Sequence, residues 1–279
     1  MTDEIVADGW TADWLVGWLA SIGVTWRDRA IKLSWTDEPV PRAVFHVNSV
    51  EQLEATMPTA EEAAALAITR ELDGRAELPR KPTHAAYADR AHLARTTTDL
   101  SVGATLSDLG IGEGDDLPHS PFDAAVPKGL TVAQRLATAC NAADGKLAPS
   151  LEGGGRTAKL NGLGFDLRRL ASSAVPGKAT VDAHAETLAF FGCLFFTQCG
   201  QETRGWASGS MFATGAFRWA TWSEPLDWAG IDAFLDHFYS RTRDCHALGP
   251  RTFESIAYRP MGSADSTRGY DGLAAGSDS

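Results

Sequence analysis

The stretch Val181-Asp-Ala-His-Ala-Glu-Thr-Leu-Ala-Phe-Phe-Gly-Cys-Leu-Phe-Phe196 contains the longest strongly apolar run of the chain, nine residues that begin at Leu188. Apolar side chains recur at helical spacing at Leu188, Phe191 and Phe195, and further apolar residues occupy the other faces. A helix that is apolar on every side lies in the interior of a protein. The stretch therefore predicts a central, fully buried helix.

The length and composition of the chain predict one globular unit. The chain has 279 residues, of which 44% are hydrophobic, and this is enough to bury a large core. We assign residues 1–261 to the unit, with a loosely packed insertion at about 73–129, and residues 262–279 to a flexible tail with little to bury. The apolar run is shorter than the roughly 20 residues of a membrane span, and the N-terminus is acidic where a secretory signal is basic. We therefore expect a cytoplasmic protein without a membrane partner.

A second helix is expected near the N-terminus. Residues 9–23, Gly-Trp-Thr-Ala-Asp-Trp-Leu-Val-Gly-Trp-Leu-Ala-Ser-Ile-Gly, place tryptophans at positions 10, 14 and 18. This spacing gives a broad apolar helical face. Gly23 is expected to end the helix, since glycine commonly follows a helix C-terminus.

Strand patterns complete the prediction of the fold class. Residues 24–35 and 41–47 are rich in β-branched and aromatic residues and flank the turn-like sequence Thr-Asp-Glu-Pro-Val-Pro at 36–41. Residues 217–222, Phe-Arg-Trp-Ala-Thr-Trp, form a second alternating segment. The expected class is α+β, mainly helical, with two short antiparallel β-hairpin regions.

Capping signals mark three more helices. Thr59–Glu62 has the spacing of a capping box before a helix at about 60–72, and Thr131–Gln134 repeats it before a helix whose apolar face includes Cys140. Asp227 is expected to cap a third helix. The buried face of that third helix is predicted at Ile231, Phe234, Leu235 and Phe238.

One basic segment interrupts an acidic chain. The formal net charge is -11, whereas residues 146–178 hold six basic residues and two acids. Within the segment, the glycine-rich residues 152–169 match neither the Walker A order nor the dinucleotide-binding order of glycines. Because arginine forks suit phosphate oxygens, we predict a nucleic-acid contact here. The candidate residues are Arg156, Lys159, Arg168, Arg169 and Lys178. The alternative is a solvated surface loop whose arginines pair with acids of the same chain.

Motifs for other chemistry are missing from the sequence. The four cysteines form no C-x-x-C pair, and the histidines and cysteines have no zinc-ligand spacing. No G-x-S-x-G or H-E-x-x-H sequence occurs. We therefore predict no catalytic residue, metal or cofactor, although a triad can assemble in space from distant residues.

Two tryptophans are candidates for contact with a partner. Trp206 follows Arg204-Gly205, and Trp222 lies in a short Thr-Trp-Ser-Glu-Pro turn. An exposed indole at such a position stacks on a base or docks on a protein. The alternative for both is packing in the core, which is the usual role of buried aromatic residues.

Several blocks of the sequence resemble a known class of proteins. The blocks are DGWTADWLVGWLASIGVTW (8–26), KLSWTDEPVPRAVF (32–45), LNGLGFDLRR (160–169), VDAHAETLAFFGCLFF (181–196), RGW (204–206) and FRWATWSEPLD (217–227). Together they resemble the short accessory and large-subunit-like proteins of type I CRISPR loci, especially subtype I-G, formerly I-U. The middle third of the chain carries little of this resemblance.

The resemblance implies a function without catalysis. It suggests a subunit of an RNA-guided antiviral complex that holds the backbone of guide RNA or target DNA and contacts the other effector subunits. Two alternatives remain open. One is a hydrolase or nuclease with a spatially assembled site, and the other is an acidic protein-interaction module without nucleic-acid contact.

Overall fold

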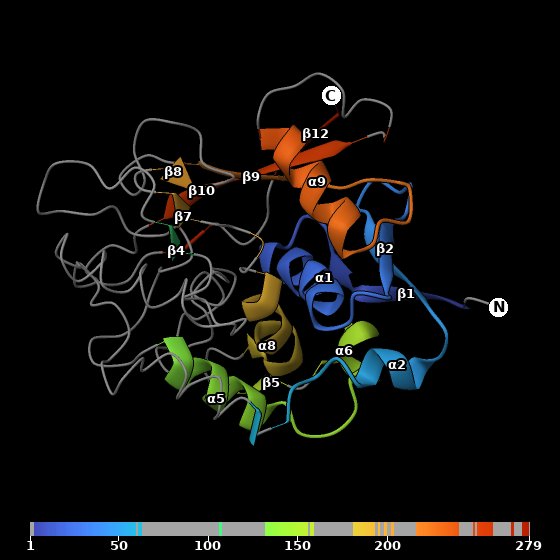
Figure 1. Ribbon diagram of the computed structural model, residues 1–279, viewed down its shortest axis with the longest axis vertical. Coiled ribbons are helices and arrows are strands. Elements are labelled where there is room, and N and C mark those ends of the chain that lie inside the picture. The colour runs from blue at the N-terminus through green and yellow to red at the C-terminus, as the bar shows by residue number, and fades with distance from the viewer. Residues whose placement is uncertain are drawn as a thin grey trace, which may run out of the picture.

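The computed structural model describes residues 3–59, 61–62, 106–107, 132–155, 157–158, 181–192, 195, 198–199, 202–203, 216–239, 248, 250–258, 269–270 and 275–278. The helices there are α1 (Leu15–Arg27), α2 (Val50–Glu54), α5 (Val132–Ala142), α6 (Ala148–Leu151), α8 (Ala183–Gly192) and α9 (Trp228–Tyr239). The strands that pair into the two larger sheets are β1 (Asp3–Thr11), β2 (Lys32–Trp35), β3 (Arg42–Val47), β9 (Ala216–Ala220), β10 (Arg251–Tyr258), β11 (Gly269–Tyr270) and β12 (Ala275–Asp278). The short strands are β4 (Leu106–Ser107), β5 (Thr157–Ala158), β6 (Val181–Asp182), β7 (Gln198–Cys199) and β8 (Glu202–Thr203). The combination of helices and antiparallel sheets confirms the α+β class (Figure 1).

Helices α1 and α8 cross in backbone contact at the centre of the fold (Figure 1). A Cβ atom on Gly23 of α1 would lie 2.0 Å from the carbonyl oxygen of Leu188. Reciprocally, a Cβ atom on Gly192 of α8 would lie 2.0 Å from the carbonyl oxygen of Leu19. Only glycine permits such an approach of two backbones. Every residue of α8 is buried, which confirms the predicted central helix.

Two predictions about the N-terminal helix are wrong. Gly23 does not end the helix, which continues to Arg27, because Gly23 provides the close crossing with α8. Trp10 lies on β1 and not on α1. Its ring packs edge-on against Phe45 of β3, with 5.9 Å between ring centroids. This tertiary contact outweighs the helical spacing of the tryptophans, and α1 begins only at Leu15.

The N-terminal sheet has the antiparallel order β1-β3-β2. Strands β2 and β3 pair across residues 36–41, the predicted turn, with Leu33 opposite Phe45. Strand β1 pairs with β3 from Asp3 to Ala7 in continuous register, and three residues without counterparts then precede the pair Thr11–Arg42. The side chains of Ala7, Leu33 and Phe45 are completely buried, so one face of the sheet covers the core.

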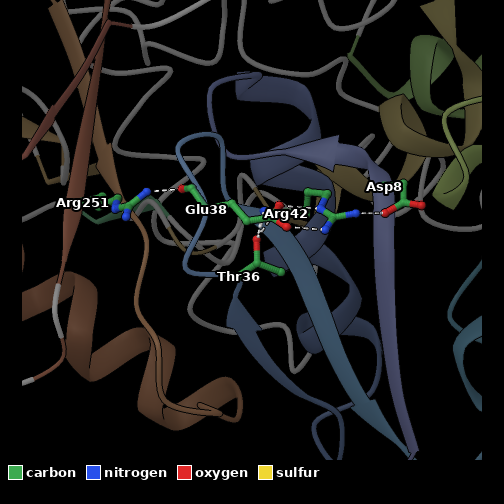
Figure 2. A network of polar contacts seen from close by, with 5 residues as sticks. All are labelled: Asp8, Thr36, Glu38, Arg42 and Arg251. Carbon is green, nitrogen blue, oxygen red and sulfur yellow. Dashed lines mark hydrogen bonds and ion pairs between the residues drawn. The ribbon is translucent and has the colours of Figure 1, made fainter.

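A polar network joins the N-terminal sheet to strand β10, which belongs to the second large sheet (Figure 2). Arg42 forms ion pairs with Asp8 of β1 and with Glu38 of the turn. Arg251 of β10 donates to the Glu38 carbonyl oxygen and lies 2.9 Å from a carboxylate oxygen of Asp37. Hydrogen bonding to Arg42 lowers the pKa of the Glu38 carboxyl. The pair is therefore present at neutral pH and is lost as the pH falls through that lowered pKa.

The second large sheet is built around β10. Strand β9 (Ala216–Ala220) pairs with residues 252–256 of β10, β12 pairs with residues 251–254 of β10 on the other side, and β11 pairs with Ala257 and Tyr258. Within the tail predicted at 262–279, the structure describes residues 269–270 and 275–278, which form β11 and β12. Of the predicted insertion at 73–129, the structure describes only residues 106–107.

Buried tryptophans connect the two ends of the chain. The indole N–H of Trp18 donates to the Ala220 carbonyl oxygen at 3.0 Å, and that of Trp219 donates to the Ala12 carbonyl oxygen at 2.6 Å. These residues belong to one hydrophobic cluster that extends from Ala7 to Phe253. A buried indole N–H needs such a partner, because an unpaired donor costs about 1–3 kcal/mol. Residues from the two ends of the chain therefore share one hydrophobic core.

The capping predictions hold in part. The hydroxyl of Thr59 accepts from the backbone N–H of Glu62 as predicted, but the Glu62 carboxylate forms an ion pair with Arg27 of α1 instead of completing the capping box. Thr131 lies outside the described residues. The Asp227 carboxylate accepts from the backbone N–H of Gly230 at the start of α9. Cys140 is buried on the inner face of α5, as predicted, and burial raises the pKa of its thiol.

Because α1 and α8 cross so closely, one added methyl group at Gly23 should strongly reduce the stability of the fold. Gly23→Ala would place Cβ against the α8 backbone, which cannot yield as a side chain does. We expect the free energy of unfolding to fall by about 2 kcal/mol or more, despite the higher helix propensity of alanine. Urea unfolding followed by circular dichroism measures the change.

The matched control is Gly154→Ala, where a Cβ atom would have its nearest neighbour at 3.7 Å, an ordinary contact. This variant should unfold within about 0.5 kcal/mol of the wild type, as surface substitutions usually do. Equal stability of the Gly23→Ala and Gly154→Ala variants would contradict the crossing geometry.

Candidate nucleic-acid interface

Most of the predicted site residues lie outside the described part of the chain. These residues are Arg156, Lys159, Arg168, Arg169, Lys178 and Trp206. The structure does describe strands β5 and β6, which flank residues 159–180 with four of the six basic residues, and it pairs these strands with each other. The geometry of these two flanks fixes where the segment leaves and rejoins the fold.

Trp222 does not have the exposure that a stacking or docking residue needs. Its side chain is 1% exposed, and its indole N–H donates to the Leu33 carbonyl oxygen at 2.8 Å. The ring packs against Phe234 of α9, with 4.9 Å between centroids. The prediction of an exposed contact at Trp222 is wrong, because the segment after β9 lies along β2 and the ring fills the space between them.

Strands β5 and β6 bring the two ends of residues 159–180 together. They pair antiparallel, with Thr157 opposite Asp182 and Ala158 opposite Val181. The 22 residues from 159 to 180 therefore leave and return at adjacent points. Those residues carry four basic side chains and one acidic side chain. The topology thus concentrates a positively charged excursion at one place, the N-terminus of α8.

A buried hydrogen-bond network anchors this place. The hydroxyl of Ser150 in α6 donates to a carboxylate oxygen of Asp182 at 2.6 Å and accepts from the indole N–H of Trp10 at 3.0 Å. The other carboxylate oxygen of Asp182 accepts from the backbone N–H groups of His184 and Ala185. Asp182 is therefore both the end of β6 and the N-cap of α8. The network joins β1, α6, β6 and α8.

Gly155 shows why the glycine run precedes the basic segment. A Cβ atom on Gly155 would lie 1.8 Å from a carboxylate oxygen of Asp182. The backbone thus passes directly over the capping carboxylate, which only glycine allows. At this position the close neighbour is a carboxylate of the protein itself.

Ser150, Asp182 and His184 are close in space but lack the geometry of a catalytic triad. The Ser150 hydroxyl donates directly to the carboxylate, and Ser150 is 1% exposed. Both ring nitrogens of His184 are buried without a hydrogen-bond partner. No imidazole therefore lies between the hydroxyl and the carboxylate to take the proton, as a triad requires. The chemistry of this cluster is helix capping.

Arg29 is a cation that the sequence reasoning missed. Its guanidinium lies over the ring of Trp228, 4.2 Å from the ring centroid, and the residue is exposed. Trp228 is held in turn by an edge-to-face contact with Trp26, with 5.6 Å between centroids. An arginine stacked on an indole keeps its donor edge available to phosphate oxygens. The sequence signal was the Trp-Arg-Asp-Arg run at 26–29.

A second polar chain crosses the N-terminal sheet. The hydroxyl of Ser34 on β2 lies 2.8 Å from Nε2 of His46 on β3, and Nδ1 of His46 lies 3.5 Å from a carboxylate oxygen of Glu4 on β1. The order of groups is that of a serine triad. Ser34, however, is only 6% exposed, while the Glu4 side chain is 68% exposed. The hydroxyl therefore faces little solvent, and the carboxylate is weakened as a partner by water.

Two other kinds of feature are absent from the described part of the chain. In the described part of the chain, no three His, Cys, Asp or Glu side chains come together as metal ligands would. Of the helices in that same part, none combines the length and apolarity needed to cross a membrane.

Comparison with known proteins gives no family for this chain. No family model, curated protein or solved structure matches it.

The hydrogen-bond network around Asp182 predicts that removing the Ser150 hydroxyl destabilises the fold. Ser150→Ala leaves the Trp10 indole N–H and one Asp182 oxygen without their partner. We expect the free energy of unfolding to fall by about 1–3 kcal/mol, the usual cost of unpaired buried groups. Ser223→Ala is the control, since its exposed hydroxyl makes one long bond of 3.3 Å to the Leu248 carbonyl oxygen. Chemical denaturation of both variants tests this, and equal midpoints would argue against an anchoring role.

Proposed function

We propose that this protein is a non-catalytic subunit of an RNA-guided, type I CRISPR-like complex, in which it holds the phosphate backbone of guide RNA or target DNA. The observation that carries the proposal is the β5–β6 pairing, which returns the basic segment to its starting point at the anchored N-terminus of α8. The proposed contact residues are Arg156, Lys159, Arg168, Arg169 and Lys178. Contacts of this kind position a strand without reading its sequence.

The fixed flanks favour binding by the basic segment. Because β5 and β6 pair and the Asp182 network holds them, the two ends of residues 159–180 already lie together, so a ligand that binds there need not supply the entropy of bringing them together. Four basic side chains within 22 residues suit a strand of phosphates. Arg29, stacked on Trp228, offers a further contact for an anion.

The arrangement of the resembling blocks also supports the proposal. The first block forms α1, and the later blocks form α8 and β9. These elements pack together, with α1 against α8 and Trp18 donating to the carbonyl oxygen of Ala220 in β9. Blocks that belong to one core are the parts that related chains would retain together. The acidic remainder of the chain suits contact with basic neighbouring subunits.

The first test is charge reversal in the basic segment. Arg168→Glu/Arg169→Glu should weaken binding of the full chain to single-stranded RNA or duplex DNA by about tenfold or more and flatten the dependence of affinity on salt. Fluorescence anisotropy over a salt series measures both quantities. The fold should remain intact by circular dichroism.

The control makes the same change in net charge at another place in the chain. Arg80→Glu/Lys81→Glu reverses another adjacent basic pair, outside the segment. If the contact is local, this control binds like the wild type. Equal losses in both double variants would mean that only overall charge matters, and unchanged binding of Arg168→Glu/Arg169→Glu would refute the proposed interface.

Hydrolysis is the second candidate, because one observation favours it. Ser34, His46 and Glu4 occupy the order of nucleophile, base and orienting acid. In such a reaction the Ser34 oxygen would attack an acyl or phosphoryl centre, its proton would pass to Nε2 of His46, and the leaving group would depart with its electron pair. Burial of Ser34 opposes this role, since the oxygen must reach the substrate.

A covalent probe separates the two candidates. A fluorophosphonate reacts with an activated serine as the P–F bond breaks and fluoride leaves. We expect the wild type and Ser34→Ala to be labelled equally slowly, because Ser34 is only 6% exposed. Intact-mass spectrometry gives the rates. Labelling that depends on Ser34 and disappears in His46→Gln would replace the nucleic-acid proposal with a hydrolase.

A further inference from the structure

Strand β1 has an open edge. It is the outer strand of the order β1-β3-β2, so its backbone pairs with β3 on one side only. The other outer strand, β2, is covered, because Leu33 exchanges backbone hydrogen bonds with Leu226 and the Trp35 N–H donates to the Trp222 carbonyl oxygen. Among the described residues, no backbone group of positions 3–7 is bonded on the outer side of β1.

The edge is accessible to solvent. Asp3, Glu4, Val6 and Asp8 are all exposed. The Val6 side chain is 41% exposed, which makes it one of three large exposed hydrophobic side chains in the described part of the chain. Figure 1 shows β1 projecting from the fold beyond α1.

The geometry suits addition of a strand. Residues Asp3 to Ala7 keep an unbroken register with β3, from the pair Asp3–Val47 to the pair Ala7–Ala43. Five residues are a typical strand length. Beyond Ala7 the register is interrupted, so an added strand would end there. An extended segment can satisfy the free N–H and C=O groups and place alternate side chains on each face.

The acidic side chains of β1 favour a partner strand with basic side chains. Asp3 makes no ion pair, Glu4 has only the 3.5 Å contact with His46, and Asp8 is paired with Arg42. No basic residue lies on β1. A second copy of β1 would bring the acids of both copies together, which is unfavourable for cross-strand neighbours. A strand with lysine or arginine at alternate positions places those side chains on one face, where it complements Glu4, since Asp3 and Glu4 point to opposite faces of β1.

We propose that the outer edge of β1 binds an extended basic strand of a partner protein by β-strand addition. The outward-pointing N–H and C=O groups within residues 3–7 supply the hydrogen bonds, and Glu4 selects for positive side chains on its face of the strand. This docking edge goes beyond the proposed function and does not depend on it, since it uses none of the residues of the basic segment. Charged edges also prevent unwanted pairing in many proteins, and the test separates these roles.

The test uses the full chain and three synthetic peptides. The probe is an eight-residue peptide of alternating lysine and valine. One control peptide carries N-methyl groups on alternate residues and so retains charge while losing backbone donors. The other control alternates glutamate and valine. Hydrogen exchange with mass spectrometry reads protection of the β1 amides, and titration calorimetry reads affinity.

Strand addition predicts that the Lys-Val peptide slows exchange in residues 3–7 about tenfold or more, as new hydrogen bonds protect edge amides. The N-methylated and Glu-Val peptides should give no protection. Asp3→Lys/Glu4→Lys should abolish binding, whereas Glu61→Lys/Glu224→Lys, which reverses two other exposed acids, should retain it.

The opposite results overturn the proposal. Equal binding of the Lys-Val peptide and its N-methylated form would mean a purely electrostatic contact, and protection confined to other segments would place the site elsewhere. Absence of any binding by the Lys-Val peptide would assign the acids a protective role only. Circular dichroism of both double variants establishes that loss of binding is not loss of the fold.

Discussion

The backbone contact between α1 and α8 is the constraint on which the remaining structure depends. Gly23 and Gly192 let the two helices approach until each would collide with a methyl group on the other. This closeness lets the remaining faces of α1 reach other elements: α1 contacts β1, β2 and α9 (Figure 1). A larger residue at either glycine would separate the helices, and the contacts of α1 with the sheet and with β9 could not both be kept.

The indole hydrogen bonds explain how the crossing is held in one arrangement. Apolar packing alone is weakly directional, whereas a buried N–H must meet a particular acceptor. Trp18 and Trp219 donate in opposite senses between the N-terminal and C-terminal parts of the chain, to the carbonyl oxygens of Ala220 and Ala12. Trp222 adds a third such bond, to Leu33. These bonds fix the position of β9 relative to α1 and β2, so the tryptophans that looked like docking sites or helix faces define the fold.

Patterns in the sequence predicted the structural elements that depend on residues close together in the chain. The apolar helix, the turn at 36–41 and the cap at Asp227 depend on residues a few positions apart, and all three occur as expected. The role of Gly23 was missed because its partner, Leu188, is distant in the chain. For the same reason, no motif signals the bond between Ser150 and Asp182. Sequence patterns showed where charge accumulates, but the pairing of β5 with β6 shows where the charged segment is attached.

The anchor at Asp182 also decides which groups near it can attract an anion. The N-terminus of a helix carries a partial positive charge and often binds phosphate through its free N–H groups. At α8 the Asp182 carboxylate already accepts from the first N–H groups, at His184 and Ala185. A phosphate would have to displace a half-buried carboxylate that Ser150 also holds. The N-terminus of α8 is therefore already occupied, and the proposed contact with a nucleic acid rests on basic side chains and not on this helix end.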